Sequence, residues 1–128
     1  MDEAELKQRT KQFALRCMAL ADSLPSNTPS GRTIANQLVR SGTSVGANYR
    51  AACRGRSKPE FIAKLGTVEE EADESAFWME LITESGMKPS PLVEPLLGEA
   101  DELVRIMVTS IRSARSALQN RKSPIQNP

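Results

Sequence analysis

The chain has 128 residues, with 17 basic and 16 acidic side chains and no histidine, so it can fold as one domain with its own core. Without histidine it lacks the usual general base and the commonest zinc ligand, and its two cysteines, Cys17 and Cys53, have no metal-ligand spacing. The amino terminus is charged, and no apolar run reaches the roughly 20 residues of a membrane span. This composition favours a cytoplasmic protein without a cofactor, a metal ion or a membrane segment.

The first predicted helix covers residues 3–23. Its apolar side chains recur at steps of three, four and seven residues, which places them on one face that can be buried. The side chains of this face are Leu6, Phe13, Cys17, Leu20 and Leu24. Pro25 ends the helix, because the residue before a proline avoids helical angles, and a polar loop follows at residues 26–30.

The second predicted helix covers residues 31–54 and ends at Gly55, which is expected in the left-handed conformation that glycine tolerates. Its core face consists of Ile34, Leu38, Val45, Tyr49 and Ala52. The segment 40–50 reads Arg-Ser-Gly-Thr-Ser-Val-Gly-Ala-Asn-Tyr-Arg and is rich in small residues. Because each glycine inside a helix costs about 1 kcal/mol relative to alanine, we expect a packing or a ligand reason for this composition.

The third predicted helix covers residues 58–85 and opens with the capping-box pattern Ser57-Lys-Pro-Glu60. Its core face consists of Phe61, Leu65, Val68, Ala72, Ala76 and Met79. The fourth helix covers residues 91–118, although Pro95 favours a later start because proline disrupts a helix interior. Its core face consists of Leu96, Ala100, Leu103, Met107, Ile111, Ala114 and Leu118.

Four long helices with short connections predict an all-α fold, an up-down-up-down four-helix bundle. No alternation of apolar and polar residues indicates a strand. The bundle is expected to form a single domain at residues 1–118, followed by a flexible tail at residues 119–128.

Charge is segregated along the chain, although the net charge is only +1. Residues 31–64 carry seven basic side chains and one acidic side chain, whereas residues 65–104 carry eleven acidic side chains and one basic side chain. Such separation indicates surfaces of opposite sign on the folded protein.

Four arginines of the second helix, Arg32, Arg40, Arg50 and Arg54, share one narrow arc opposite the core when about 100° is counted per residue. Like charges four residues apart repel, so an anion-binding or interface surface is the alternative to an ordinary solvated face. The guanidinium group suits phosphate and carboxylate alike. The candidate nucleic-acid-binding residues are Arg32, Arg40, Arg50, Arg54, Arg56, Lys58 and Lys64.

Three large apolar residues of the third helix, Phe77, Trp78 and Leu81, lie outside its core face, together with Glu70 and Glu74. Either Trp78 folds over a neighbouring helix, or these residues form a second buried surface, as in a subunit contact. An arginine surface that faces an acidic surface with an aromatic anchor suits a heterologous contact, which can close a ring of identical copies. These five residues are therefore the candidate oligomer interface.

The acidic run at residues 69–74 could suggest a carboxylate metal site, but consecutive side chains point around a helix and do not converge. A solvated acidic face is the preferred interpretation. The hydroxyls of segment 41–44 have no visible general base, and Gly42 and Gly46 lack the strand and lysine context of a phosphate-binding loop. The sequence therefore predicts that the protein is not an enzyme and has no catalytic, cofactor-binding or metal site.

Three blocks of the sequence stand out together by their order and spacing. They are residues 40–52, Arg56-Ser-Lys-Pro-Glu-Phe-Ile-Ala-Lys-Leu65, and Glu71-Ala-Asp-Glu-Ser-Ala-Phe-Trp-Met-Glu-Leu81. In this combination they closely resemble the bacterial four-helix bundle proteins, which are also called ribosomal RNA intervening-sequence proteins. The resemblance implies a left-handed bundle that assembles into a homopentamer. Some relatives are encoded in sequences that interrupt the large-subunit ribosomal RNA gene.

A related branch, the accessory variability proteins of diversity-generating retroelements, is similar in fold and binds nucleic acid and a reverse transcriptase through basic surfaces. Arg40, Arg56 or Lys58, and Lys64 match basic positions of the family. The resemblance implies an accessory protein that associates with structured RNA or a nucleoprotein. The alternative is a structural homo-oligomer, a protein-interaction scaffold whose arginines pair with the acidic helix of another copy.

Overall fold

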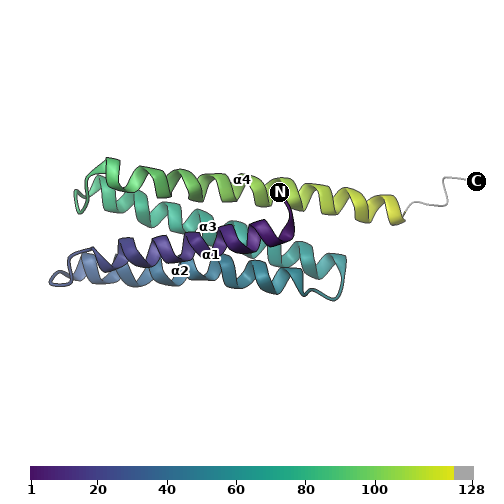
Figure 1. Cartoon of the computed structure of the whole chain (residues 1–128), viewed down its shortest axis with the longest axis horizontal. Helices are drawn as coiled ribbons and strands as arrows, with labels where there is room; N and C mark the ends of the chain where they lie inside the picture. The colour runs from purple at the N-terminus through teal and green to yellow at the C-terminus, as the bar shows by residue number, and fades with distance from the viewer. Residues whose placement is uncertain (123–128) are drawn as a thin grey trace, which may run out of the picture.

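A computed structural model describes residues 1–122, which form four α-helices lying side by side along one long axis (Figure 1). The helices are α1 (Glu3–Asp22), α2 (Pro29–Cys53), α3 (Lys58–Glu84) and α4 (Ser90–Lys122). No strand occurs in this part of the chain, so the predicted all-α class and its four helices are confirmed. The left-handed twist and the homopentamer stay predictions.

Each helix packs against the one before it and runs back along it, so the turns alternate between the two ends of the bundle (Figure 1). The contacts between consecutive helices are extensive, whereas α1 packs only sparsely against α4. One end of the bundle carries the start of α1 and the turn between α2 and α3. The other end carries the remaining two turns.

The core is mainly apolar and contains most of the residues that the spacing predicted. Phe13, Leu38, Leu65 and Leu103, one from each helix, are completely buried. Three of the predicted core residues are only half-buried, because each lies near the end of its helix. These are Leu20, Phe61 and Leu118.

Polar caps determine where three of the helices begin. The cap residues are Asp2, Thr28 and Ser57, and the side chain of each accepts a hydrogen bond from the backbone N–H three residues later. The predicted cap at Ser57 is confirmed, although the carboxylate of Glu60 accepts from the N–H of Arg56 (3.2 Å), one residue before the cap. α2 begins at Pro29, two residues before the predicted start, because proline is favoured in the first turn behind a cap.

The predicted left-handed conformation of Gly55 is wrong. Among the described residues only Gly86, in the turn after α3, has a positive φ, of 80°. Gly55 is accounted for by space, since a Cβ there would lie 3.0 Å from the carbonyl oxygen of Ala52. The backbone folds back tightly at this turn, and the absence of a side chain permits it.

The fourth helix begins within one residue of its predicted start, whereas the later start that Pro95 favoured and the predicted end at residue 118 are wrong. α4 begins at Ser90 and continues through Pro95, because a proline in the second turn removes only one intrahelical hydrogen bond and lies at the exposed surface. The helix extends to Lys122, so residues 119–122 are helical rather than part of a tail. The rest of the predicted tail, residues 123–128, lies outside the described residues.

Candidate functional site

The small residues of segment 40–50 let α1 and α2 approach each other closely. A Cβ at Gly42 would lie 2.5 Å from the Cβ of Cys17 and 2.6 Å from its Sγ, so no side chain fits there. A Cβ at Gly46 would lie 3.3 Å from the backbone oxygen of Thr10. Packing therefore accounts for both glycines, and of the two expected reasons for this composition it is the one that the structure supports.

The same segment faces α3 with a buried pair of hydroxyl groups. Ser75 donates a hydrogen bond to the Oγ of Ser41 (2.8 Å), and both side chains are completely buried. The Ser75 hydroxyl also lies 2.9 Å from the carbonyl oxygen of Glu71. Every buried side-chain polar atom of the described residues has a hydrogen-bond partner. A satisfied buried pair of this kind favours one register of α2 on α3.

Arg40 lies beside this serine pair and joins two carboxylates of α3. Its Nη1 lies 3.0 Å from Oε2 of Glu71, and its Nη2 contacts the carboxylate of Glu74. The indole N–H of Trp78 donates to the same carboxylate of Glu74 (3.1 Å). Arg40 was predicted to bind nucleic acid, and Glu74 and Trp78 to contact another subunit. The structure brings all three together within one chain.

The arginines predicted on one arc of α2 diverge in the structure. Arg40 turns to α3, while Arg32, near the start of α2, is exposed and donates to the carbonyl oxygen of Ser26 (3.1 Å). Arg50, Arg54 and Arg56 are exposed and form no ion pair within the described residues. Only this last group is available to an external anion as a cluster.

Two lysines of α1, which the sequence analysis did not single out, extend this group. Lys7 and Lys11 line a hollow of about 290 Å³ together with Arg50 of α2. Lys7 also pairs with the exposed carboxylate of Glu3 (3.2 Å), a contact that water screens strongly. In the sequence, the spacing of four residues between the two lysines indicates only that they share one face of their helix. Their proximity to Arg50 could not be predicted, because it depends on how α1 packs against α2.

We call the resulting cluster the basic end of the bundle, since it surrounds the turn between α2 and α3 and the adjoining part of α1 (Figure 1). Its members are Lys7, Lys11, Arg50, Arg54, Arg56, Lys58 and Lys64. Lys58 opens α3, where a cation opposes the helix dipole, so helix stability does not explain its charge. Its ammonium group lies 5.7 Å from the ring centroid of Phe61.

The candidate oligomer-interface residues of α3 divide into two groups. Trp78 and Leu81 are half-buried and pack against the core of their own chain, as expected if Trp78 folds over a neighbouring helix. Their contact with another copy stays a prediction. Phe77 is 49% exposed, and Glu70 is exposed as well. The rings of Phe77 and Trp78 meet edge to face, with centroids 5.1 Å apart. Phe77 therefore remains as a large apolar side chain on an acidic surface.

The ionisable groups of the core favour their protonated, unreactive forms. Burial raises the pKa of the Cys17 thiol to about 12. Burial also raises the pKa of Tyr49 and of Cys53. A thiol that stays protonated at neutral pH is a poor nucleophile.

No group of three or more His, Cys, Asp or Glu side chains among the described residues could hold a metal ion. None of the four described helices has both the length and the hydropathy of a membrane-spanning segment.

Comparisons with known proteins agree with this architecture. A family model described as 23S rRNA-intervening sequence protein matches residues 2–109. Among solved structures, the chain is similar to a protein with unknown function from the S23 ribosomal protein family of Bacteroides thetaiotaomicron, with 30% sequence identity and a TM-score of 0.77. This match covers 83% of the present chain and 97% of the other. A search of curated proteins finds no match.

Proposed function

The chain belongs to the 23S rRNA-intervening sequence protein family, and from this premise we propose that it is a noncatalytic accessory protein that binds structured RNA through the basic end of its bundle. One observation carries the proposal: seven cations from three helices and one turn gather at this end, whereas α3 is acidic farther along. We also propose a cytoplasmic location, because Cys17 and Cys53 are unpaired thiols, as in a reducing compartment.

Arg50, in the last turn of α2, interacts favourably with the dipole of that helix. Like charges that gather on one surface repel each other, however, so the fold gains little from the cluster as a whole. Phosphate groups of a nucleic acid would offset this repulsion. Their contact with the cations would also release the counterions that are condensed on the nucleic acid, which favours binding. Among the described residues, the basic end presents no fully exposed aromatic ring for base stacking, since Tyr49 is 5% exposed and Phe61 is half-buried. We therefore expect contacts to the RNA backbone, with little dependence on base sequence.

The proposal includes assembly into a homopentamer of left-handed, up-down-up-down bundles. Phe77 supports a contact between copies, because a half-exposed aromatic ring on a charged surface is typical of a binding anchor. A purely structural scaffold that binds no nucleic acid is the competing function, and Phe77 favours this function equally. The two functions differ in whether the basic end binds RNA.

An electrophoretic mobility shift with a structured RNA, at about 50 and 200 mM salt, separates the two functions. If four to seven of the cations contact phosphates, affinity should fall by roughly 10²- to 10⁴-fold between these salt concentrations. The absence of a shift even at low salt would contradict RNA binding and leave the scaffold function.

The double variant Arg50→Glu/Arg54→Glu should abolish the shift while leaving the size of the assembly unchanged. Arg32→Glu is its matched control, because Arg32 is an exposed arginine of the same helix at the opposite end of the bundle. The control should bind RNA like the wild type. If the double variant instead disturbs assembly and leaves RNA binding intact, these arginines serve subunit contact and the proposal is wrong.

A further inference from the structure

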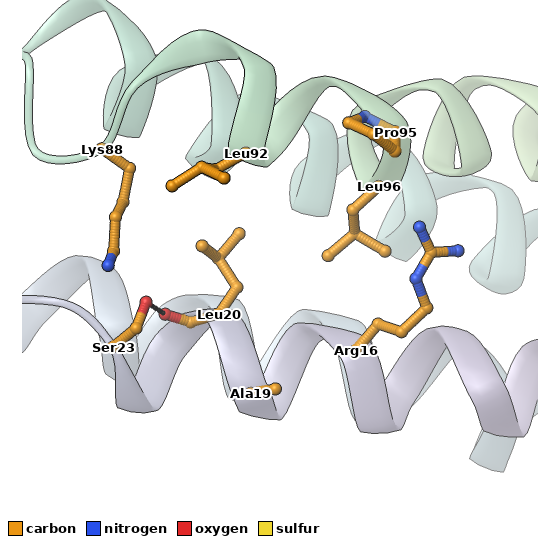
Figure 2. Close-up of a pocket in the computed structure, with 8 residues that line it drawn as sticks. All are labelled: Arg16, Ala19, Leu20, Ser23, Lys88, Leu92, Pro95 and Leu96. Atoms are coloured by element: carbon orange, nitrogen blue, oxygen red, sulfur yellow. Dashed lines mark hydrogen bonds between the residues drawn. The ribbon is translucent and has the colours of Figure 1, made fainter.

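A hollow of about 320 Å³ opens where α1 packs sparsely against α4 (Figure 2). Leu20 of α1 and Leu92 and Leu96 of α4 give it an apolar lining. Leu92 is 67% exposed, more than any other large apolar side chain of the described residues. Arg16 and Lys88 lie at the two ends of the hollow (Figure 2), and neither forms an ion pair within the described part of the chain.

The exposed surface of α3 is complementary to this hollow. Phe77 projects from it, and carboxylates surround the ring at spacings of three, four and seven residues, which places them on the same side of the helix. These exposed carboxylates are Glu70, Asp73, Glu80 and Glu84. None of them forms an ion pair within the described residues. An apolar ring among unpaired anions thus corresponds to an apolar hollow between unpaired cations.

We infer that Phe77 of one copy enters the hollow between α1 and α4 of a second copy, with the carboxylates around Phe77 facing Arg16 and Lys88. The aromatic ring supplies the buried anchor, and the opposite charges at the rim align the two copies and exclude wrong partners. The inference rests on the assembly included in the proposed function and names the two surfaces that join its copies.

The two surfaces lie at the same height along the bundle, which determines what kind of assembly they form. At about 1.5 Å per residue, Phe77 lies roughly 10 Å from the carboxyl end of α3. The lining of the hollow extends from Leu20 and Leu92, roughly 3 Å from that same end of the bundle, to Arg16 and Leu96, roughly 9 Å from it. Neighbouring copies can therefore join with little or no step along the axis. A heterologous contact without a step closes into a ring when its rotation divides the full circle, whereas a contact with a step builds a filament.

A ring of this kind keeps all bundles pointing in one direction, so their basic ends gather on one side. An RNA that reaches two or more basic ends is held by each of them at a high effective concentration. Assembly and RNA affinity are thus coupled, although they use different residues.

Two exposed positions test the contact without disturbing the core: Phe77→Ser removes the anchor, and Leu92→Glu places a carboxylate in the hollow. Each variant should weaken the assembly by about 30-fold or more, measured by sedimentation, while its urea midpoint shows that the bundle still folds. Leu15→Glu is the matched control, because Leu15 is 50% exposed on α1 and lies outside both surfaces. The control should assemble like the wild type.

Mixing the two variants gives the sharpest result. Phe77→Ser still has an intact hollow and Leu92→Glu still has Phe77, so an equimolar mixture should form a one-to-one dimer and nothing larger, as measured by light scattering. A mixture that stays monomeric, or single variants that keep the size of the wild type, would overturn the inference. A monomeric wild type would overturn it as well.

RNA binding separates failure of this inference from failure of the proposed function. The Phe77→Ser variant retains the basic end, so it should still shift RNA, with about 10-fold or greater loss of affinity from the lost multivalency. If it assembles normally and binds RNA normally, only the docking contact is wrong. If the Phe77→Ser variant dissociates and neither this variant nor the wild type binds RNA, the docking contact is supported and the proposed RNA binding is wrong.

Discussion

The hydroxyl oxygens of Ser41 and Ser75 lie 2.8 Å apart in the buried contact between α2 and α3. Neither side chain is exposed to solvent, and the only other partner of the Ser41 hydroxyl is the carbonyl oxygen of Leu38, at the long distance of 3.5 Å. Ser41 therefore depends on Ser75 for its hydrogen bond. Arg40 and Glu71, which lie next to this pair, are joined to each other at the surface.

The Ser75→Ala variant should lower the free energy of unfolding by about 1–2 kcal/mol, because it leaves the Ser41 hydroxyl buried without a good partner. The double variant Ser41→Ala/Ser75→Ala should cost less than the sum of the two single variants, since it removes both polar groups together. Urea denaturation of the four proteins in this cycle measures the coupling. Strictly additive costs would show that the two hydroxyls do not depend on each other.

The Gly42→Ala variant should destabilise the bundle by about 1–3 kcal/mol, because the added methyl group would overlap the side chain of Cys17 and force α1 away from α2. This cost outweighs the gain of about 1 kcal/mol that alanine normally brings to a helix interior. Gly66→Ala is the matched control, since no atom lies within 4 Å of a Cβ at Gly66. The control should be more stable than the wild type, and equal stability of the two variants would contradict close packing at Gly42.

The helices and their core faces could be predicted because apolar spacing is a local property of the sequence. All five residues predicted for the core face of α2 are buried. Helix ends were less predictable, since they depend on contacts between turns as well as on local signals. Pro95 lies within α4, where an exposed second turn tolerates it, and Gly55 is favoured by a nearby carbonyl group rather than by its φ.

The candidate site could be predicted only in part, because a helical wheel gives directions on one helix and says nothing about its neighbours. Arg40 and Arg50 share an arc of α2 in such a wheel. In the structure Arg40 reaches the carboxylates of α3, whereas Arg50 lies with two lysines of α1. Arginine side chains are long, so two of them that leave a helix in similar directions can contact different neighbours. The packing of the bundle determines which neighbour each one contacts.

The buried thiol of Cys17 should make the protein less stable at alkaline pH. Its pKa is raised from the ordinary 9.0 to about 12 by burial, so the unfolded chain loses this proton first as the pH rises. Above about pH 9 the unfolded state binds fewer protons than the folded state, and the free energy of unfolding falls by up to roughly 1.4 kcal/mol per pH unit. Below that pH the contribution is fully present.

Comparison with Cys17→Ala isolates this effect from Tyr49 and Cys53, whose raised pKa values act in the same direction. Urea midpoints measured between about pH 7.5 and 10.5 should fall less steeply for the variant than for the wild type. Two parallel curves would show that the thiol of Cys17 ionises equally in the folded and unfolded states.

Arg9 and Glu99 form a two-pronged ion pair between α1 and α4, with distances of 2.6 Å from Nε to Oε2 and 2.8 Å from Nη2 to Oε1. The hydrogen bonds to Glu99 raise the pKa of Arg9, so the guanidinium stays charged. Because α1 otherwise packs sparsely against α4, Arg9→Met should lower the free energy of unfolding by about 1–2 kcal/mol. Amide exchange should then accelerate more in α1 than in α2. The charge swap Arg9→Glu/Glu99→Arg should restore part of the stability, which a role of Arg9 in packing alone would not allow.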